Sequence, residues 1–262
     1  MSRLPSLPPT LQRRIAERRL LKVIAGLSNF DGAAVERIAR AAAAGGADLI
    51  DIACDPSLVA RVAASAPGLP ICVSAVDPEL FPAAVRAGAM LVEIGNFDVF
   101  YPQGRVFGAE EVLELTRRTR ALLPEVVLSV TVPHVLPLDA QEQLAADLQV
   151  AGADLIQTEG STSARPRAAG TLGLIEKAAP TLAAAHAISH AVDLPVLCAS
   201  GLSAVTAPMA IAAGASGVGV GSAVNRLDDE LAMLAVVRSL RETLDAALPI
   251  APTDRLRSVK RP

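Results

Sequence analysis

The strongest constraint on the fold is a Gly-Ala pair that recurs four times along the chain. Each pair follows an alanine-rich stretch and opens a short run of mostly apolar or small residues. The four segments are Gly46–Ala53, Gly88–Gly95, Gly152–Glu159 and Gly214–Gly221. Glycine ends helices because it adopts the left-handed backbone conformation without a steric penalty, so each pair predicts a helix-to-strand junction. An internal repeat of this kind indicates a chain built from one supersecondary unit.

Four further short apolar runs alternate with the repeats and also predict strands. They span Leu21–Gly26, Leu69–Val76, Val126–Val132 and Leu194–Ser200. Helical patterns follow the eight predicted strands at Gly32–Ala44, Ser57–Ala64, Glu79–Ala87, Glu110–Leu122, Ala140–Val150, Ile175–Ala191, Ala204–Ala213 and Asp229–Ala246. This strict alternation predicts an α/β fold, a single (β/α)₈ TIM barrel of parallel strands. An open doubly wound sheet is the alternative, but its glycine-rich fingerprint should follow the first strand, where only Gly26 stands.

No linker rich in proline, glycine or serine divides the middle of the 262-residue chain, which favours one domain. We expect a helical extension over residues 1–20, the barrel over residues 21–248 and a flexible tail over residues 249–262. The helix within this extension should begin at Pro8-Pro9-Thr10, a pattern typical of a helix start. Its Leu11 and Ile15 should face the bottom of the barrel.

Composition excludes several classes of function. The net charge of −3 and the low aromatic content of 2% argue against a nucleic-acid partner, which requires a basic face and stacking rings. No uncharged apolar run reaches the roughly 18 residues of a membrane span. The three cysteines stand in or beside apolar runs without metal-ligand spacing and should be buried free thiols. His186 and His190 lack a third ligand, so the sequence predicts no metal site.

The predicted seventh and eighth strands both end in small residues. One ends in Ala199-Ser200-Gly201, and the other in Gly219-Val220-Gly221-Ser222. Small residues let backbone N–H groups approach an anion, and paired ends after these two strands form the phosphate site of many TIM barrels. The predicted phosphate-binding or cofactor-binding residues are Ser200, Gly201, Gly219, Gly221 and Ser222. The alternative is that these glycines only allow tight turns.

Superposition of the four repeats places polar side chains inside the barrel. Asp51, Glu93 and Gln157 share one level, and Glu159 lies one level nearer the mouth. Buried polar groups are costly unless they are hydrogen-bonded or used in catalysis. Lys22 in the first strand could pair with these carboxylates or, with a lowered pKa, form a Schiff base. Lys22, Asp51 and Glu93 are therefore candidates for a structural network or for catalysis.

Two further residues are candidates for acid/base catalysis. His134 follows the fifth strand and Glu159 ends the sixth, so both should lie at the mouth, where active sites of this fold occur. The loop over residues 95–105 holds three of the six aromatic residues and could form either a lid or a packing cluster.

The chain resembles a family of uncharacterised plastid and cyanobacterial proteins labelled hypothetical chloroplast reading frame twenty-three. The resemblance rests on LKVIAGLSNFD, LPICVSAVDPELF, VEIGNFDVFY, LSVTVPH, ADLIQTEG and GTLGLIEKAAPTL, and spans about Leu21 to Leu244. It implies an aldolase-type TIM barrel of unknown activity, located in the cyanobacterial cytoplasm or, for plastid relatives, the stroma. The paired loops after strands seven and eight are also similar to those of flavin mononucleotide barrels related to nitronate monooxygenase.

Three functions follow as alternatives. The first is an enzyme that acts on a small phosphorylated metabolite by proton transfer or carbon–carbon chemistry. The second is an oxidoreductase that holds the phosphate of flavin mononucleotide at the same loops. The third is a non-catalytic binding or regulatory barrel, because fold alone does not establish chemistry. Nucleic-acid and membrane partners are not expected, and a homo-oligomer is left open.

Overall fold

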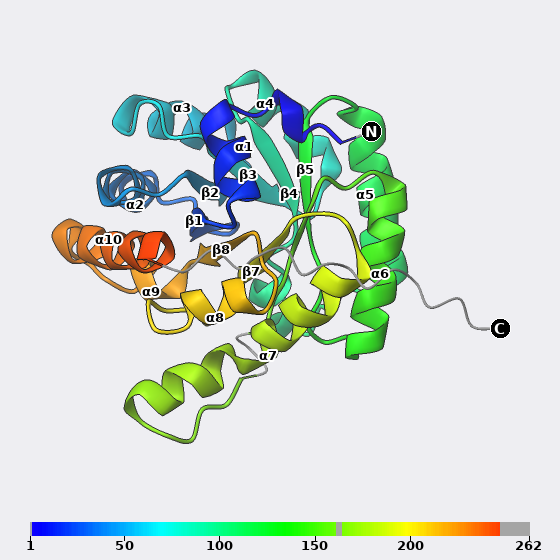
Figure 1. Cartoon of the computed structure of the whole chain (residues 1–262). Helices are drawn as coiled ribbons and strands as arrows, with labels where there is room; N and C mark the ends of the chain where they lie inside the picture. Colours follow the sequence, from blue (N-terminus) through cyan, green and yellow to red (C-terminus); the bar gives the residue numbers. More distant parts are fainter. Residues whose placement is uncertain (1, 161–163, 247–262) are drawn as a thin grey trace.

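The computed structural model describes residues 2–160 and 164–246 and confirms the predicted TIM barrel (Figure 1). Eight strands pair in sequence order, all in parallel, and β8 closes on β1. The strands are β1 (Leu20–Gly26), β2 (Leu49–Ala53), β3 (Ile71–Ala75), β4 (Leu91–Ile94), β5 (Val127–Thr131), β6 (Leu155–Gln157), β7 (Val196–Ala199) and β8 (Gly217–Val220). The predicted tail over residues 249–262 lies outside the described residues.

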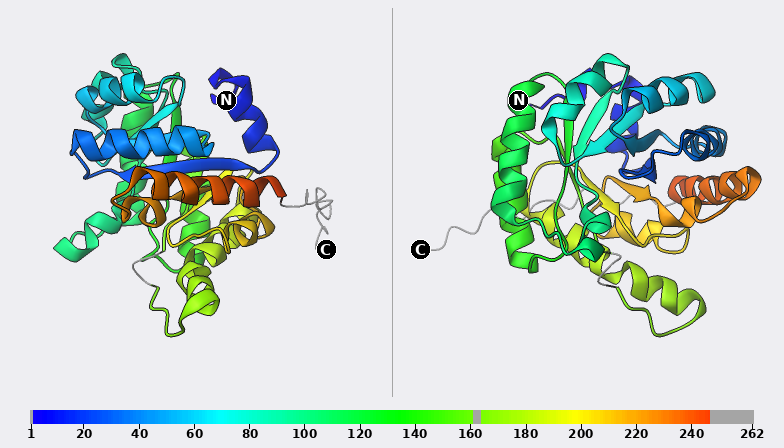
Figure 2. Two further views of the ribbon diagram at one scale, coloured as in Figure 1. Left: turned by 90° about the vertical axis from the view of Figure 1, so that its left-hand side faces the viewer. Right: turned by 180° about the vertical axis from the view of Figure 1, so that it is seen from behind.

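Helices surround the strands on the outside of the barrel (Figure 2). They are α1 (Pro9–Ala16), α2 (Gly32–Gly45), α3 (Pro56–Ser65), α4 (Phe81–Arg86), α5 (Ala109–Leu122), α6 (Leu138–Ala151), α7 (Gly170–Ala191), α8 (Ala207–Ala212), α9 (Ser222–Asn225) and α10 (Glu230–Ala246). Short 3₁₀ turns are η1 (Leu4–Ser6), η2 (Pro78–Leu80), η3 (Phe97–Val99) and η4 (Tyr101–Gln103). Among the described residues, no helix is both long and apolar enough to cross a bilayer.

The start of α7 differs from the sequence prediction. The helix begins at Gly170, five residues before the expected Ile175, and its first turns project away from the barrel (Figure 1). Glycine at position 173 suggested a loop, but here it serves packing. A side chain at Gly173 would collide with the backbone carbonyl of Ala168. The close approach of two backbone segments therefore explains this glycine.

The repeated Gly-Ala pairs act at the junctions as predicted. Their glycines all adopt positive φ angles: Gly46 at 90°, Gly88 at 118°, Gly152 at 98° and Gly214 at 111°. Two of them, Gly46 and Gly152, are the C-caps of α2 and α6. The left-handed conformation turns the chain from the helix into the next strand, and glycine adopts it without a steric penalty.

Two repeats add an aspartate that fastens the start of the preceding strand. Asp48 accepts a hydrogen bond of 2.8 Å from the backbone N–H of Leu21, and Asp154 accepts one of 3.0 Å from Leu128. Each carboxylate also pairs with an arginine of an outer helix: Arg241 lies 3.0 Å from Asp48, and Arg120 lies 2.8 Å from Asp154. These charges stabilise the bottom of the barrel, where neighbouring strands begin.

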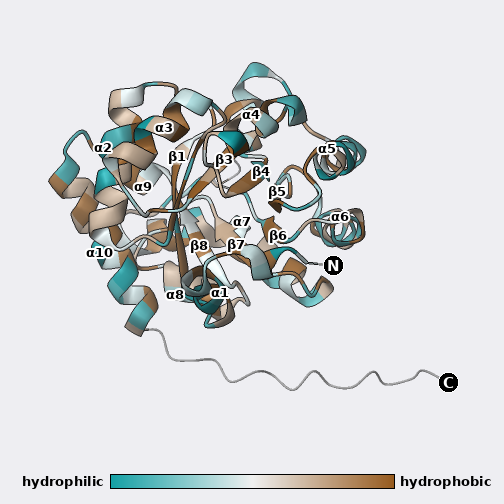
Figure 3. Cartoon of the chain, turned by 90° about the horizontal axis from the view of Figure 1, so that it is seen from above, coloured by the Kyte–Doolittle hydropathy of each residue, from teal (hydrophilic) through white to brown (hydrophobic). Residues whose placement is uncertain are grey.

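Hydrophobic side chains fill two regions. The larger core lies between the strands and the outer helices. It contains two of the three buried free cysteines, Cys54 and Cys198, and the smaller core contains the third, Cys72. The smaller core closes the bottom of the barrel, where Leu7, Leu11 and Ile15 around α1 pack on strand residues. Figure 3 shows strands that are mostly hydrophobic and outer helices that carry polar patches. The expectation that the N-terminal helix covers the barrel bottom is confirmed.

Candidate functional site

Below the mouth of the barrel, a buried ion pair occupies the interior. The Lys22 Nζ atom lies 2.6 Å from Glu93 Oε2 and 3.9 Å from Asp51 Oδ2. All three side chains are 1% exposed or less. The sequence predicted that these residues meet, and the register of β1, β2 and β4 brings them together.

Neutral side chains complete this interior network. Ser74 donates a hydrogen bond of 2.5 Å to Asp51, Ser129 donates one of 2.7 Å to Glu93, and Gln157 donates one of 2.7 Å to Glu93. Asn96 joins the network from above, because its amide nitrogen lies 3.1 Å from oxygens of both Asp51 and Glu93. Asn96 adopts a left-handed conformation with φ of 61°. It links the buried ion pair to the mouth, a role that the sequence did not reveal.

The electrostatics of the network favour a structural role for Lys22. Burial alone would lower the pKa of Lys22, but the carboxylates of Glu93 and Asp51 outweigh it and raise the pKa. Burial raises the pKa of Asp51 to about 6, although Lys22 opposes this shift. A Schiff base requires a neutral amine. The amine of Lys22 is held protonated, so the ion pair supports the network alternative rather than covalent catalysis.

The raised pKa of Asp51 predicts a specific dependence of stability on pH. The unfolded carboxyl loses its proton near its ordinary pKa of 3.8, whereas the folded carboxyl keeps it up to about pH 6. The stabilisation that protonated Asp51 contributes is therefore complete below about pH 3.8 and is lost as the pH rises through about 6. We expect the stability of the wild type, relative to Asp51→Asn, to fall by on the order of 2–3 kcal/mol between about pH 4 and pH 7. Urea unfolding at several pH values measures this difference, and a flat or rising difference would contradict the assignment.

At the mouth, Glu159 is the centre of a second polar cluster. Its Oε2 atom lies 2.9 Å from Nδ1 of His134 and accepts hydrogen bonds from the Tyr101 hydroxyl at 2.7 Å and the backbone N–H of His134 at 3.2 Å. Its Oε1 atom accepts one of 3.0 Å from the backbone N–H of Asp98. Glu159 and His134, predicted separately from the ends of β6 and β5, are thus in direct contact.

The mouth cluster has perturbed ionisation. Burial raises the pKa of Glu159, although the hydrogen bond from His134 opposes this shift. Burial also opposes the charged form of His134, but the hydrogen bond and charge of Glu159 outweigh it, so the pKa of His134 is raised. Burial and the Glu159 charge together raise the pKa of Tyr101. Perturbed ionisable groups in a cleft are typical of functional sites.

The loop between β4 and α5 combines the two roles that the sequence left open, a lid over the site and an aromatic packing cluster. Its aromatic rings pack on each other: Phe97 and Phe100 lie 4.5 Å and 5.4 Å from Phe107 between ring centroids. The polar residues of the loop reach across the mouth, where Asp98 and Tyr101 contact Glu159. The aromatic cluster therefore anchors a loop whose polar side closes on the site. Asp98 and Tyr101 were missed as site residues because only the fold brings this loop to β6.

A pocket of about 210 Å³ lies beside the mouth cluster, above the ends of β7 and β8. Four of the predicted phosphate-binding residues line it, Ser200, Gly201, Gly221 and Ser222, together with residues that include Asn96, Asp98 and Asn225. Within the part of the chain that the structure describes, the backbone N–H groups of Gly201 and Ser222 donate no hydrogen bond. These N–H groups can therefore donate hydrogen bonds to a bound anion.

Local geometry explains the glycines of the pocket. Gly201 has a φ of 75°, and a Cβ atom at this position would lie 2.7 Å from the carbonyl oxygen of Lys177. Both features exclude a side chain. Gly219 was predicted to bind phosphate, but it lies within β8, and the pocket lining does not include it. It shares the deeper level of Gln157, whose amide oxygen would be 3.4 Å from a Cβ atom at Gly219.

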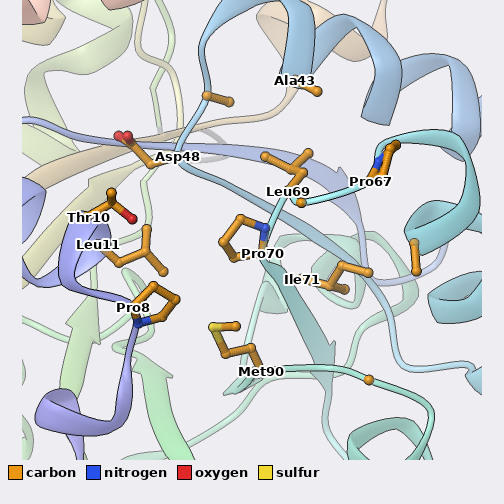
Figure 4. A pocket seen from close by; sticks show the side chains of 14 residues that line it. Pro8, Thr10, Leu11, Ala43, Asp48, Pro67, Leu69, Pro70, Ile71 and Met90 are labelled. Atoms are coloured by element: carbon orange, nitrogen blue, oxygen red, sulfur yellow. The ribbon is translucent and has the colours of Figure 1, made fainter.

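A larger cavity of about 540 Å³ lies at the opposite end of the barrel (Figure 4). Most of the residues that line it have apolar side chains, among them Pro8, Leu11, Pro70 and Met90. Among the described residues of the lining, Asp48 is the one carboxylate, and it is paired with two arginines and a backbone N–H. The described lining of this cavity therefore contains no ionisable side chain that lacks a partner. The candidate site is the smaller pocket at the mouth.

Solved structures resemble this chain in fold. Thiamine phosphate pyrophosphorylase from Pyrococcus furiosus is 17% identical with a TM-score of 0.60, and the match covers 88% of this chain and 98% of that one. The GGGPS of Thermoplasma volcanium is 13% identical with a TM-score of 0.64, and the match covers 96% of this chain and all of that one (100%). At these identities the similarity shows the aldolase-type TIM fold alone.

Sequence relatives are much closer. The uncharacterized protein ycf23 of Cyanophora paradoxa is 44% identical over 226 residues, which are 86% of this chain and 93% of the relative. This agrees with the resemblance noted from the sequence motifs. A family model described as a protein of unknown function, DUF561, matches residues 7–248. The chain therefore belongs to the DUF561 family of proteins of unknown function.

Proposed function

We propose that this protein is an enzyme that binds a small phosphorylated metabolite in the pocket above β7 and β8. The observation that carries the proposal is the convergence of two loops, Ser200–Gly201 and Gly221–Ser222, on one pocket beside the Glu159–His134 pair. Exposed backbone N–H groups in small-residue loops suit a phosphate, and catalytic groups of this fold lie at the same face. One structural neighbour, thiamine phosphate pyrophosphorylase, has a phosphorylated compound in its name, which is consistent with this ligand class.

Glu159 and His134 are the proposed groups for proton transfer. Glu159 follows β6, and 3% of its side chain is exposed. Its Oε2 atom lies 2.9 Å from Nδ1 of His134. A carboxylate and an imidazole in contact can pass a proton to or from a bound substrate. Lys22, Asp51 and Glu93 lie beneath this level and would act by holding Asn96, which lines the pocket. The proposed compartment is the cyanobacterial cytoplasm or the plastid stroma.

The size of the pocket favours a small ligand over flavin mononucleotide. Its volume of about 210 Å³ is below the roughly 300–1,000 Å³ of pockets that hold drug-sized ligands. Flavin mononucleotide carries a three-ring system and a sugar-alcohol chain besides its phosphate, and these would extend beyond a pocket of this volume. A short phosphorylated compound would not.

Substitutions at the Glu159–His134 pair separate catalysis from binding. We expect Glu159→Gln and His134→Ala to reduce turnover of a phosphorylated metabolite by about 100-fold or more, because each removes one proton-transfer group. Conversion in a cell metabolite extract, followed by mass spectrometry, measures turnover. Binding of inorganic phosphate, measured in the absence of a divalent metal, should change by less than about threefold.

The matched control is Glu110→Gln at the start of α5, which makes the same chemical change outside the pocket lining. It should convert the extract at the wild-type rate. If Glu159→Gln and His134→Ala also convert it at that rate, the pair is not catalytic, and the non-catalytic binding alternative gains support.

A further inference from the structure

Three potential metal ligands converge beside the proposed phosphate pocket, and one of them, Asp98, lines it. Asp98, His134 and Glu159 follow or end β4, β5 and β6, and one ligand atom from each lies within 4.8 Å of the other two. His134 Nδ1 is 2.9 Å from Glu159 Oε2 and 3.6 Å from Asp98 Oδ1. We propose that these three side chains bind a divalent transition-metal cation, with Mn²⁺ as the type case. The cation would join the protein to the phosphate of the ligand.

The two separations measured from His134 Nδ1 are close to those between ligands of one metal ion. Around an octahedral ion with bonds of about 2.1 Å, adjacent ligands lie about 3 Å apart and opposite ligands about 4.2 Å apart. The observed separations of 2.9 Å and 3.6 Å are close to the shorter value. One imidazole and two carboxylates form a mixed set of nitrogen and oxygen ligands. Such a set suits Mn²⁺ or Zn²⁺ better than Ca²⁺, which prefers oxygen ligands only.

A second observation also points to a cation. Asp98 lines the pocket together with Gly201 and Ser222, the residues proposed to hold phosphate, and its Oδ2 accepts a hydrogen bond of 3.1 Å from Ser200. A carboxylate in the wall of an anion site repels the anion. A cation between the two converts this repulsion into a bridge, because the ion becomes the largest local charge. The metal thus explains why an acidic side chain belongs to this wall.

The surrounding hydrogen bonds would orient the ligands. Glu159 keeps its bonds from Tyr101 and from the backbone N–H of Asp98, and such outer contacts fix the direction of metal-bound carboxylates. The ion takes the place of the proton between Glu159 and His134. This inference rests on the proposed phosphate site, and in the metal-bound state Glu159 and His134 are ligands rather than the proton-transfer pair.

The test uses the full chain, purified with a chelator that is then removed. Electron paramagnetic resonance of free Mn²⁺ counts the ions bound, and calorimetry measures inorganic phosphate binding with and without Mn²⁺. We expect one Mn²⁺ per chain and phosphate affinity at least tenfold higher in its presence. Asp98→Asn should weaken Mn²⁺ binding at least tenfold and abolish the enhancement, while phosphate affinity without metal stays equal or rises. His134→Gln should also weaken Mn²⁺ binding.

Asp139→Asn is the matched control, because Asp139 is an exposed aspartate at the start of α6 and outside the cluster. It should behave as the wild type. Absence of Mn²⁺ binding, or wild-type Mn²⁺ binding by both Asp98→Asn and His134→Gln, overturns the metal site. Equal phosphate affinity with and without Mn²⁺ overturns the bridge. Absence of phosphate binding in both states overturns the proposed function, and Mn²⁺ binding by the wild type then still supports the metal ligands.

Discussion

Replacement of Lys22 with methionine is expected to lower the free energy of unfolding by about 3–5 kcal/mol. The substitution keeps a long side chain but removes the cation that lies 2.6 Å from Glu93 and 3.9 Å from Asp51. Two carboxylates would then share a site without exposure to water and without a counter-charge. Urea denaturation near neutral pH measures the loss.

The control for this substitution is Lys177→Met, which makes the same change in a partly exposed lysine of α7. It should alter stability by no more than about 0.5 kcal/mol. The double variant Lys22→Met with Glu93→Gln should recover part of the loss, because it removes the uncompensated charge. A loss below about 1 kcal/mol for Lys22→Met alone would show that the ion pair does not stabilise the barrel.

Replacement of Gly221 with aspartate is expected to weaken inorganic phosphate binding by about 100-fold or more. Gly221 lines the pocket, and a Cβ atom at this position would lie 3.3 Å from the backbone carbonyl of Ile24. The new carboxylate would enter the space proposed for phosphate, where like charges at short range cost several kcal/mol in a partly desolvated site. Calorimetric titration with phosphate measures the effect.

The matched control is Gly108→Asp. Gly108 is the N-cap of α5. Among the described residues, no side chain caps the start of that helix and no atom lies within 4 Å of a Cβ atom placed at Gly108. Aspartate is favourable at an N-cap, so this variant should keep both its stability and its phosphate affinity. Equal phosphate binding by Gly221→Asp and Gly108→Asp would place the anion elsewhere.

The barrel could be predicted because the sequence repeats its local signals. The four Gly-Ala junctions marked the helix ends, and their superposition placed Asp51, Glu93 and Gln157 at one level and Glu159 at the next. The hydrogen bonds from Gln157 to Glu93 and from Asn96 to Asp51 and Glu93 agree with that layering. Period and register are local properties, so a single sequence carries them.

The links between the layers could not be predicted in the same way. Asn96 connects the ion pair to the pocket through a left-handed conformation, which the sequence pattern did not require. Tyr101 and Asp98 reach Glu159 across about 60 residues of sequence, with separations of 58 and 61. The depth of Gly219 depends on where β8 ends, and strand boundaries are the least certain part of a sequence prediction.

We expect a phosphate to occupy the pocket above β7 and β8. Amide chemical shifts of the ¹⁵N-labelled protein, recorded during titration with inorganic phosphate in the presence and absence of Mn²⁺, test it most directly. We expect saturable shifts at Gly201 and Ser222, and none at Gly68 and Gly88 beside the cavity at the barrel bottom. Shifts confined to the bottom cavity, or no saturable shift at Gly201 and Ser222, would contradict the claim.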